Sequence, residues 1–131
     1  MAHVLHSHNG LCKNIHGHSY HLHVTLTGEV KNEPGTTDDG MLMDFGDLKA
    51  IVKEKILNHF DHALVVNSKA PFTNQILKLP FERIMAVPFQ PTCENLILNF
   101  AKRMVVALPL DVRLHRLKLY ETDTSYAEWH A

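Results

Sequence analysis

Hydrophobic and polar residues alternate along the chain from His18 onward. The even-numbered positions are apolar or aromatic: Tyr20, Leu22, Val24 and Leu26. The odd-numbered positions between them are polar: His21, His23, Thr25 and Thr27. In a β-strand, successive side chains point to opposite faces. The pattern therefore predicts a strand with one buried face.

Two later segments carry apolar residues at helical spacing instead. The first predicts a helix over about residues 45–59, with a stripe formed by Phe45, Leu48, Ile51, Val52 and Ile56. The second helix is expected after Thr92, a suitable N-cap, with Glu94 near the positive helix start, and it ends at Pro109. Between them, residues 67–91 contain four prolines and are expected to form a long loop with short extended pieces.

Two closing strands are predicted after the second helix. The apolar positions of the first are Val112, Leu114, Leu117 and Leu119. Their parity changes after Leu114, which predicts a bulge or bend near residues 115–116. Residues 125–130 form a short last strand. The order strand, helix, helix, strand, strand predicts an α+β fold, with both helices on one face of an antiparallel sheet. Such a sheet has open edges, so either a first strand is missing or the edges pair in an oligomer.

Composition narrows the class of protein. A chain of 131 residues with 45% hydrophobic residues fits one ordinary domain spanning 1–131. The net charge of -1 and the absence of a basic run argue against general nucleic-acid binding. No apolar run approaches membrane-spanning length and no secretory leader is evident, so we expect a cytoplasmic protein with no membrane partner. Cys12 and Cys93 are then expected to be free thiols.

Histidine is the informative excess. The chain has 11 histidines, and seven of them fall within the first 23 residues. His16 and His18 lie two positions apart at a strand start, so they project to the same face, and Gly17 lets another backbone come close. Neutral imidazoles are good zinc ligands, so this pair supplies half of a tetrahedral site.

A third ligand would leave one coordination position open, as in catalytic zinc sites. His3, His6 and His8 are all candidates on position alone. His21 and His23 lie on the opposite strand face by parity and receive no role. Cys12 could close the site as a fourth ligand, or it could stay off the metal as a base or nucleophile.

Three further positions carry possible chemistry. Asp61 and His62 could form a general acid–base pair, although neighbours in sequence rarely bond each other directly, and a solvated helix end is favoured on these two residues alone. Glu121 shares the face of the buried leucines by parity, where a carboxylate is costly without donors. An amino-pyrimidinone ring would supply two N–H donors. Cys93 is expected to be a small buried apolar residue.

Together these features resemble the 6-pyruvoyl-tetrahydropterin synthase and 6-carboxy-tetrahydropterin synthase family. Six matching stretches come in the family's order and cover nearly the whole chain: AHVL at 2–5, CKNIHGH at 12–18, GMLMDFGDLK at 40–49, DH at 61–62, PTCEN at 91–95 and ET at 121–122. The resemblance implies a tunnelling fold, in which a four-stranded antiparallel sheet carries two helices on one face. It also implies trimers that stack into a homohexamer. The family's opening strand is expected to be truncated here, because only Met1 precedes the Ala-His position.

The resemblance implies roles for individual residues. The zinc ligands would be His3, His16 and His18, and the catalytic thiol would be Cys12. Asp61 and His62 would form the proton-relay pair. Glu121 and Thr92 would bind the pterin. The relay pair would face the thiol from a neighbouring subunit, and Glu121 is often counted with that relay.

The short Cys-x-x-x-His-Gly-His spacing resembles the bacterial 6-carboxy enzyme of the queuosine pathway. The implied reaction is a zinc-dependent lyase reaction that converts 7,8-dihydroneopterin triphosphate to 6-carboxy-5,6,7,8-tetrahydropterin, with release of acetaldehyde and triphosphate. A pyruvoyl-tetrahydropterin synthase is the first alternative. A non-catalytic zinc-binding module with Cys12 as fourth ligand is the second. A metallohydrolase would need a carboxylate beside the metal, and none is evident near His16.

Overall fold

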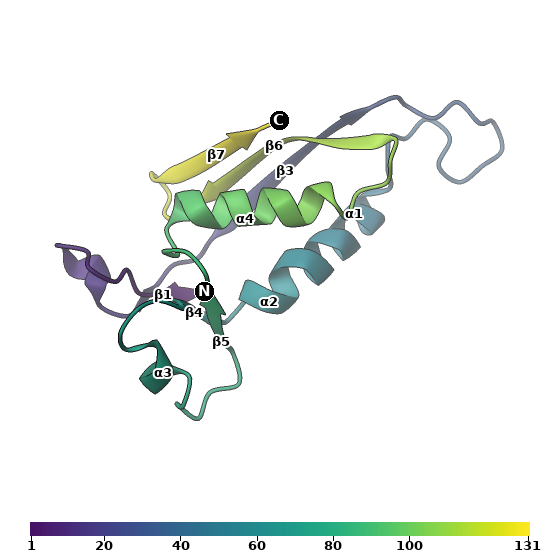
Figure 1. The fold of residues 1–131 in the computed structure, drawn as a ribbon. Coiled ribbons are helices and arrows are strands. Elements are labelled where there is room, and N and C mark those ends of the chain that lie inside the picture. The colour runs from purple at the N-terminus through teal and green to yellow at the C-terminus, as the bar shows by residue number, and fades with distance from the viewer.

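A computed structural model describes residues 1–131 as two β-sheets and two main helices (Figure 1). The strands are β1 Ala2–His3, β2 His16–Gly17, β3 His21–Gly28, β4 Leu64–Asn67, β5 Ile84–Val87, β6 Val112–Tyr120 and β7 Tyr126–His130. The helices are α1 Phe45–Val52, α2 Asn58–Phe60, α3 Thr73–Ile76 and α4 Cys93–Val105, with a 3-10 turn at Leu11–Lys13 and a π-helical turn at Lys53–Leu57. None of the helices is both long and apolar enough to cross a membrane.

The sheet with the longer strands is antiparallel, with strand order β3-β6-β7. Along β3, exposed and half-buried residues alternate, as the pattern from His18 predicts. The predicted bulge in β6 is confirmed, because Thr25 pairs with Arg116 whereas Leu26 pairs with Leu114, leaving His115 as the extra residue. This bulge turns the leucines on both sides of it toward the same core.

The two predicted helices are confirmed. Helix α1 runs through the π-helical turn into α2, so helical structure extends from Phe45 to Phe60. The π-helical turn frees backbone carbonyls, and Arg103 of α4 donates to the Lys55 carbonyl at 3.1 Å. Thr92 is the N-cap of α4, with its hydroxyl oxygen accepting from the Asn95 backbone N–H at 3.3 Å.

The second sheet differs from the sequence-based expectation. The α+β class holds, but only three strands join the antiparallel sheet; β1 instead lies between β2 and β4, in the order β2-β1-β4-β5. β4 pairs in parallel with both β1 and β5, so the segment expected to be a long loop contributes α3 and β5. Parallel strands buried on both faces show no alternation, which is why the run from Leu64 to Val66 gave no strand signal. β1 has two residues.

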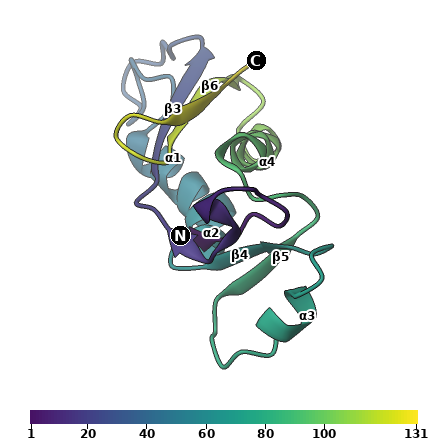
Figure 2. The ribbon, with the colours of Figure 1, turned by 90° about the vertical axis from the view of Figure 1, so that its left-hand side faces the viewer.

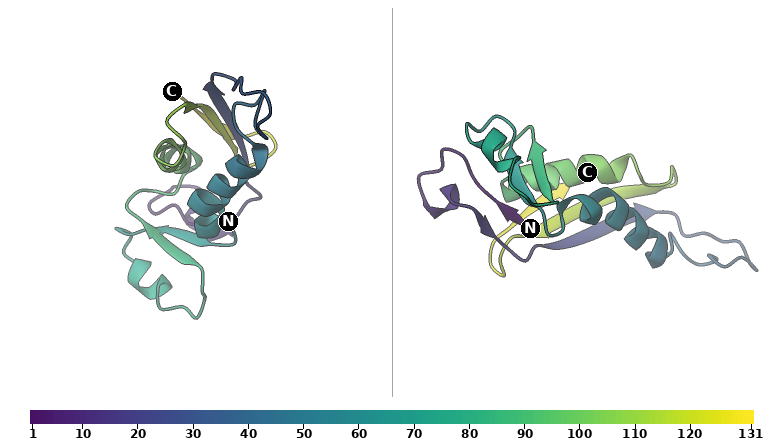
Figure 3. Two further views of the ribbon diagram at one scale, coloured as in Figure 1. Left: turned by 90° about the vertical axis from the view of Figure 1, so that its right-hand side faces the viewer. Right: turned by 90° about the horizontal axis from the view of Figure 1, so that it is seen from below.

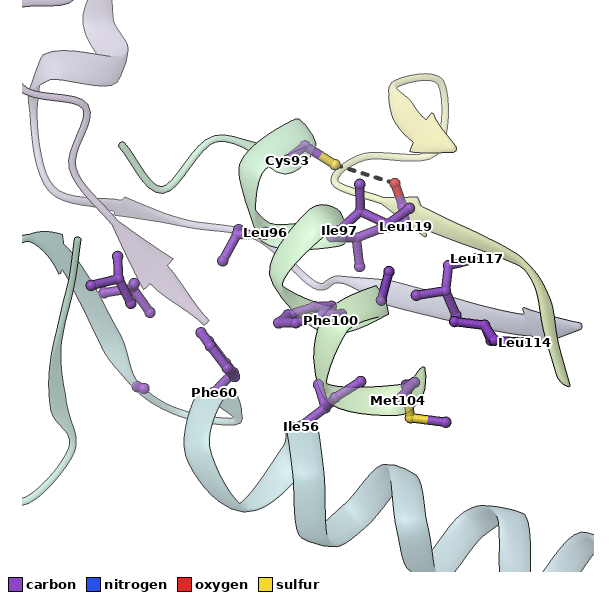
Figure 4. Close-up of a cluster of buried hydrophobic side chains, with 14 residues drawn as sticks. Ile56, Phe60, Cys93, Leu96, Ile97, Phe100, Met104, Leu114, Leu117 and Leu119 are labelled. Atoms are coloured by element: carbon purple, nitrogen blue, oxygen red, sulfur yellow. Dashed lines mark hydrogen bonds between the residues drawn. The ribbon is translucent and has the colours of Figure 1, made fainter. Parts of the chain in front are cut away.

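One hydrophobic core joins both sheets to the helices (Figure 4). Leu117 and Leu119 of β6 are almost fully buried, and Leu96 of α4 lies in the same cluster. Phe60 and Phe100 meet edge to face, with ring centroids 4.9 Å apart, so the end of α2 packs on α4. Views from the side and from below show both helices against one face of the antiparallel sheet (Figure 3).

Replacing Leu117 with alanine should destabilise the fold by about 2–5 kcal/mol, because it leaves a cavity at a fully buried position. Urea unfolding followed by circular dichroism measures the change. Leu110→Ala is the matched control, since that side chain is fully exposed. Equal stability losses in the two variants would contradict the placement of the core.

Candidate active site

Three histidines converge at the point where β1 meets β2. The antiparallel pairing sets His3 directly opposite His16, and His18 follows the end of β2. One ligand nitrogen from each of the three rings lies within 4.8 Å of the others. The structure thus brings together the three ligands that the sequence predicted. His6 and His8 lie outside this cluster, hydrogen-bonded within their own loop.

Two backbone carbonyls fix the orientation of the first two rings. His3 Nδ1 lies 2.7 Å from the Pro91 oxygen, and His16 Nδ1 lies 2.8 Å from the Asn14 oxygen. A carbonyl only accepts, so in both rings Nδ1 carries the hydrogen and Nε2 presents a lone pair. The two Nε2 atoms are 3.0 Å apart.

Two lone pairs this close repel each other unless a cation or a proton lies between them. Imidazole nitrogens bound to a tetrahedral zinc ion are about 3.4 Å apart, given Zn–N distances of about 2.0–2.1 Å. The donor set is neutral imidazole nitrogen throughout, which suits zinc, copper, iron or nickel. The residues present therefore fit a metal ion.

Backbone pairing holds His3 in place. The Ala2 N–H donates to the Ala63 oxygen at 2.8 Å, and His3 is 1% exposed. Burial lowers the pKa of His3, which keeps the ring neutral and able to bind a metal. On the other side of β1, a Cβ added at Gly17 would stand 3.3 Å from the Met1 oxygen, so glycine permits this close approach as expected.

A carboxylate lies beside the cluster, which corrects the expectation that none stands near His16. Glu121 Oε1 is 3.8 Å from His3 Nε2 and 4.0 Å from His18 Nε2. The sequence concealed this because Glu121 is 103 positions from His18; pairing of β3 with β6 brings the two ends together. The Tyr20 hydroxyl donates to the same oxygen at 2.9 Å and so meets the need for a donor.

Tyr20 was assigned only to the buried face from sequence. Burial, and then the charge of Glu121, raise the pKa of Tyr20, so its hydroxyl stays protonated and remains a donor. The alternation along the strand could have predicted this role, because residue 20 lies on the same face as residues 16 and 18.

Cys12 belongs to the 3-10 turn Leu11–Lys13 and is half-buried. Its sulfur is not one of the ligand atoms that converge at the cluster. The absence of the sulfur from this set favours a thiol that stays off the metal over a fourth ligand.

Asp61 and His62 lie close together: Asp61 Oδ1 is 3.0 Å from His62 Nδ1. The two side chains form no hydrogen bond with good geometry, as expected for neighbours in sequence. His62 has a φ of 57°, in the left-handed region, and this turn at the helix end swings its ring back toward the carboxylate. Arg83 donates to the Asp61 backbone oxygen at 2.9 Å and holds the turn. Both side chains are exposed, at the wall of a cavity of about 520 Å³ that His18 and Tyr20 also line.

Comparison with known proteins identifies the family. A family profile described as "6-pyruvoyl tetrahydropterin synthase" matches residues 1–131. The chain belongs to this family. It is 34% identical over 132 residues to a 6-carboxy-5,6,7,8-tetrahydropterin synthase of Haemophilus influenzae, covering 98% of this chain and 91% of that one. It is 31% identical over 118 residues to a 6-pyruvoyl tetrahydrobiopterin synthase of Pongo abelii, covering 88% and 68% of the two chains.

Solved structures of the family show the same fold. An uncharacterized protein of Wolinella succinogenes superimposes with a TM-score of 0.78 at 18% identity, covering 98% of this chain and 91% of that one. A 6-pyruvoyl tetrahydropterin synthase of Plasmodium vivax superimposes with a TM-score of 0.71 at 16% identity, covering 99% and 88%. The expected tunnelling fold is therefore confirmed.

The second cysteine of this family member is buried, as predicted. Cys93 Sγ donates to the Leu119 oxygen at 3.2 Å, and burial raises its pKa to about 11 (Figure 4). In native protein at pH 8, iodoacetamide should therefore modify Cys12 at least about tenfold faster than Cys93, because only the thiolate reacts. Peptide mapping by mass spectrometry measures both rates, and denatured protein is the control in which they converge. Comparable native rates would contradict the burial of Cys93.

Proposed function

We propose that this protein converts 7,8-dihydroneopterin triphosphate to 6-carboxy-5,6,7,8-tetrahydropterin, releasing acetaldehyde and triphosphate. This reaction supplies the queuosine pathway in bacteria that make that base. The observation that carries the proposal is the convergence of three imidazole nitrogens beside a carboxylate. Relatives in Haemophilus influenzae and Rickettsia typhi are named for the same product, which also supports the proposal.

His3, His16 and His18 would hold a zinc ion and leave one coordination position open. When bound, zinc supplies a Lewis acid for the hydroxyl groups of the substrate side chain. The carbonyls of Pro91 and Asn14 keep two of the rings in the tautomer that this requires. Burial of His3 excludes water from one side of the site.

Cys12 and the Asp61–His62 pair would move the protons. The Asp61 carboxylate lies 3.0 Å from His62 Nδ1, where it would stabilise a protonated ring, and His62 Nε2 would take up or release the proton. Both residues are exposed in one chain, which suits a site completed by a second subunit. We therefore include a homohexamer, with active sites between subunits, in the proposal.

Glu121 and Thr92 would bind the pterin ring. Tyr20 occupies one oxygen of Glu121, so the other oxygen is available to accept from the amino-pyrimidinone edge. Thr92 uses its oxygen to cap α4, which leaves its hydroxyl hydrogen as a donor, and the preceding residue, Pro91, contacts His3.

The 6-pyruvoyl product is the second candidate, because the relative from Pongo abelii carries that name at 31% identity. Zinc-loaded protein incubated with 7,8-dihydroneopterin triphosphate separates the candidates when its products are analysed by mass spectrometry. We expect 6-carboxytetrahydropterin with acetaldehyde. A pyruvoyl product would support the second candidate, and a zinc-bound protein without turnover would support the non-catalytic module.

A further inference from the structure

The Cys12 thiol sits at the end of a closed loop. The Leu5 N–H donates to the Cys12 oxygen at 3.0 Å, and the His8 N–H donates to the Leu5 oxygen at 3.2 Å. These bonds join the loop to itself and fix its internal shape. One contact at the base of the loop links it to the histidine cluster, since His16 Nδ1 lies 2.8 Å from the Asn14 oxygen.

Gln90 supplies a second connection. Its side-chain Nε2 donates to the His6 oxygen, 84 positions away in sequence. Apart from His16, it is the one side chain from outside residues 5–14 that hydrogen-bonds to the loop. Figure 2 shows the N-terminal segment beside the connection that leads from β5 into α4.

The segment around Gln90 is itself firmly held. The Gln90 backbone oxygen accepts from the Thr92 N–H at 2.8 Å and from Asn95 Nδ2 at 3.0 Å. The next residue, Pro91, provides the oxygen that orients His3. Two consecutive residues therefore hold the thiol loop and a metal ligand, and they share one rigid base at the start of α4.

The other end of the Gln90 amide is unsatisfied. The His6 oxygen can only accept, so Nε2 must face it, and Oε1 is then buried without a partner. A buried acceptor without a donor disfavours folding, and an apolar side chain of the same shape would avoid that loss. Stability alone therefore does not explain a glutamine at this position.

We propose that Gln90 is a positioning residue that sets the Cys12 loop against His3, and so fixes where the thiol stands relative to the bound substrate. This inference rests on the proposed function for the role of Cys12. Gln90 holds the loop that carries Cys12, whereas Pro91 orients the metal ligand His3. Changing Gln90 should therefore lower the rate of reaction without lowering the affinity for the metal.

Gln90→Leu removes both polar ends at similar volume, and Gln90→Glu places a carboxylate oxygen against the His6 oxygen. Displacing a reacting group by about 1 Å can cost about 100-fold in rate, so we expect kcat to fall by about 10- to 100-fold. KM and the zinc content of one ion per chain should stay within about twofold, because His3 keeps its Pro91 contact. Alkylation of Cys12 by iodoacetamide should become several-fold faster as the loop loosens.

Gln75→Glu and Gln75→Leu are the matched controls, since Gln75 is exposed on α3. Should Gln90→Leu fail to fold, Gln90→Asn keeps the amide but shortens its reach and serves in its place. Unchanged kcat and alkylation in the folded variants would overturn the inference, as would loss of zinc in proportion to kcat. If the wild-type protein forms no pterin product, the proposed function fails, while faster Cys12 alkylation in the Gln90 variants still supports the positioning role.

Discussion

His16→Ala should lower the affinity for zinc by at least about 100-fold while leaving the fold intact. Loss of groups that only orient a ligand already costs about 10- to 100-fold, and loss of the ligand itself costs more. His16 Nε2 faces His3 Nε2 at 3.0 Å, so the variant leaves two imidazoles with an enlarged gap. His16 is only half-buried and lies outside the core cluster, so stability should change little.

Competition with a chromophoric chelator measures this affinity, and circular dichroism checks the fold. His8→Ala is the matched control, because His8 is exposed and bonds only the Gly10 N–H of its own loop. His3→Ala is less informative, since a fully buried side chain also supports the fold. Zinc binding that survives His16→Ala and is lost in His8→Ala would show that the ligand set is wrong.

Cys12→Ala should keep zinc and lose turnover by about 100- to 10,000-fold, the range for removing a group that transfers protons in the transition state. The sulfur lies outside the set of converging ligand atoms, so alanine removes no metal bond. The thiol is half-buried and free, so it remains available to move a proton.

Zinc content and product formation are measured on the same preparation of this variant. Cys93→Ala is the control, because Cys93 is buried under Leu119 and should affect stability rather than turnover. Loss of zinc from Cys12→Ala would identify the thiol as a fourth ligand, which is the arrangement of a non-catalytic zinc module.

The parts of the fold with a strong local pattern were predictable. Alternation along β3, the N-cap at Thr92 and the parity change at His115 each depend on residues close in sequence, and each appears in the structure. β4 was not predictable, because its central residues Val65 and Val66 are both buried and such a strand has no period of two. β5 is only four residues long and lies at the edge of its sheet. The pairing of β1 with β4 depends on contacts more than 60 positions apart.

The candidate site also has a part that was predictable from sequence and a part that was not. His16 and His18 share a strand face, so their convergence follows from spacing, and His3 joins them through the pairing of β1 with β2. The contact of Glu121 with the cluster needed the register of β3 against β6, which sequence parity did not give. The close approach of Asp61 and His62 depends on the left-handed backbone of His62, and nothing in the sequence marked that residue for such a conformation.

The central claim is that zinc held by three histidines makes this protein a 6-carboxytetrahydropterin synthase. The most direct test titrates zinc into chelator-stripped protein and measures acetaldehyde released from 7,8-dihydroneopterin triphosphate. Acetaldehyde release should rise in proportion to added zinc and level off at one ion per chain. The His16→Ala variant should be inactive at the same zinc concentrations. Acetaldehyde release from zinc-free protein, or none from zinc-saturated protein, would contradict the central claim.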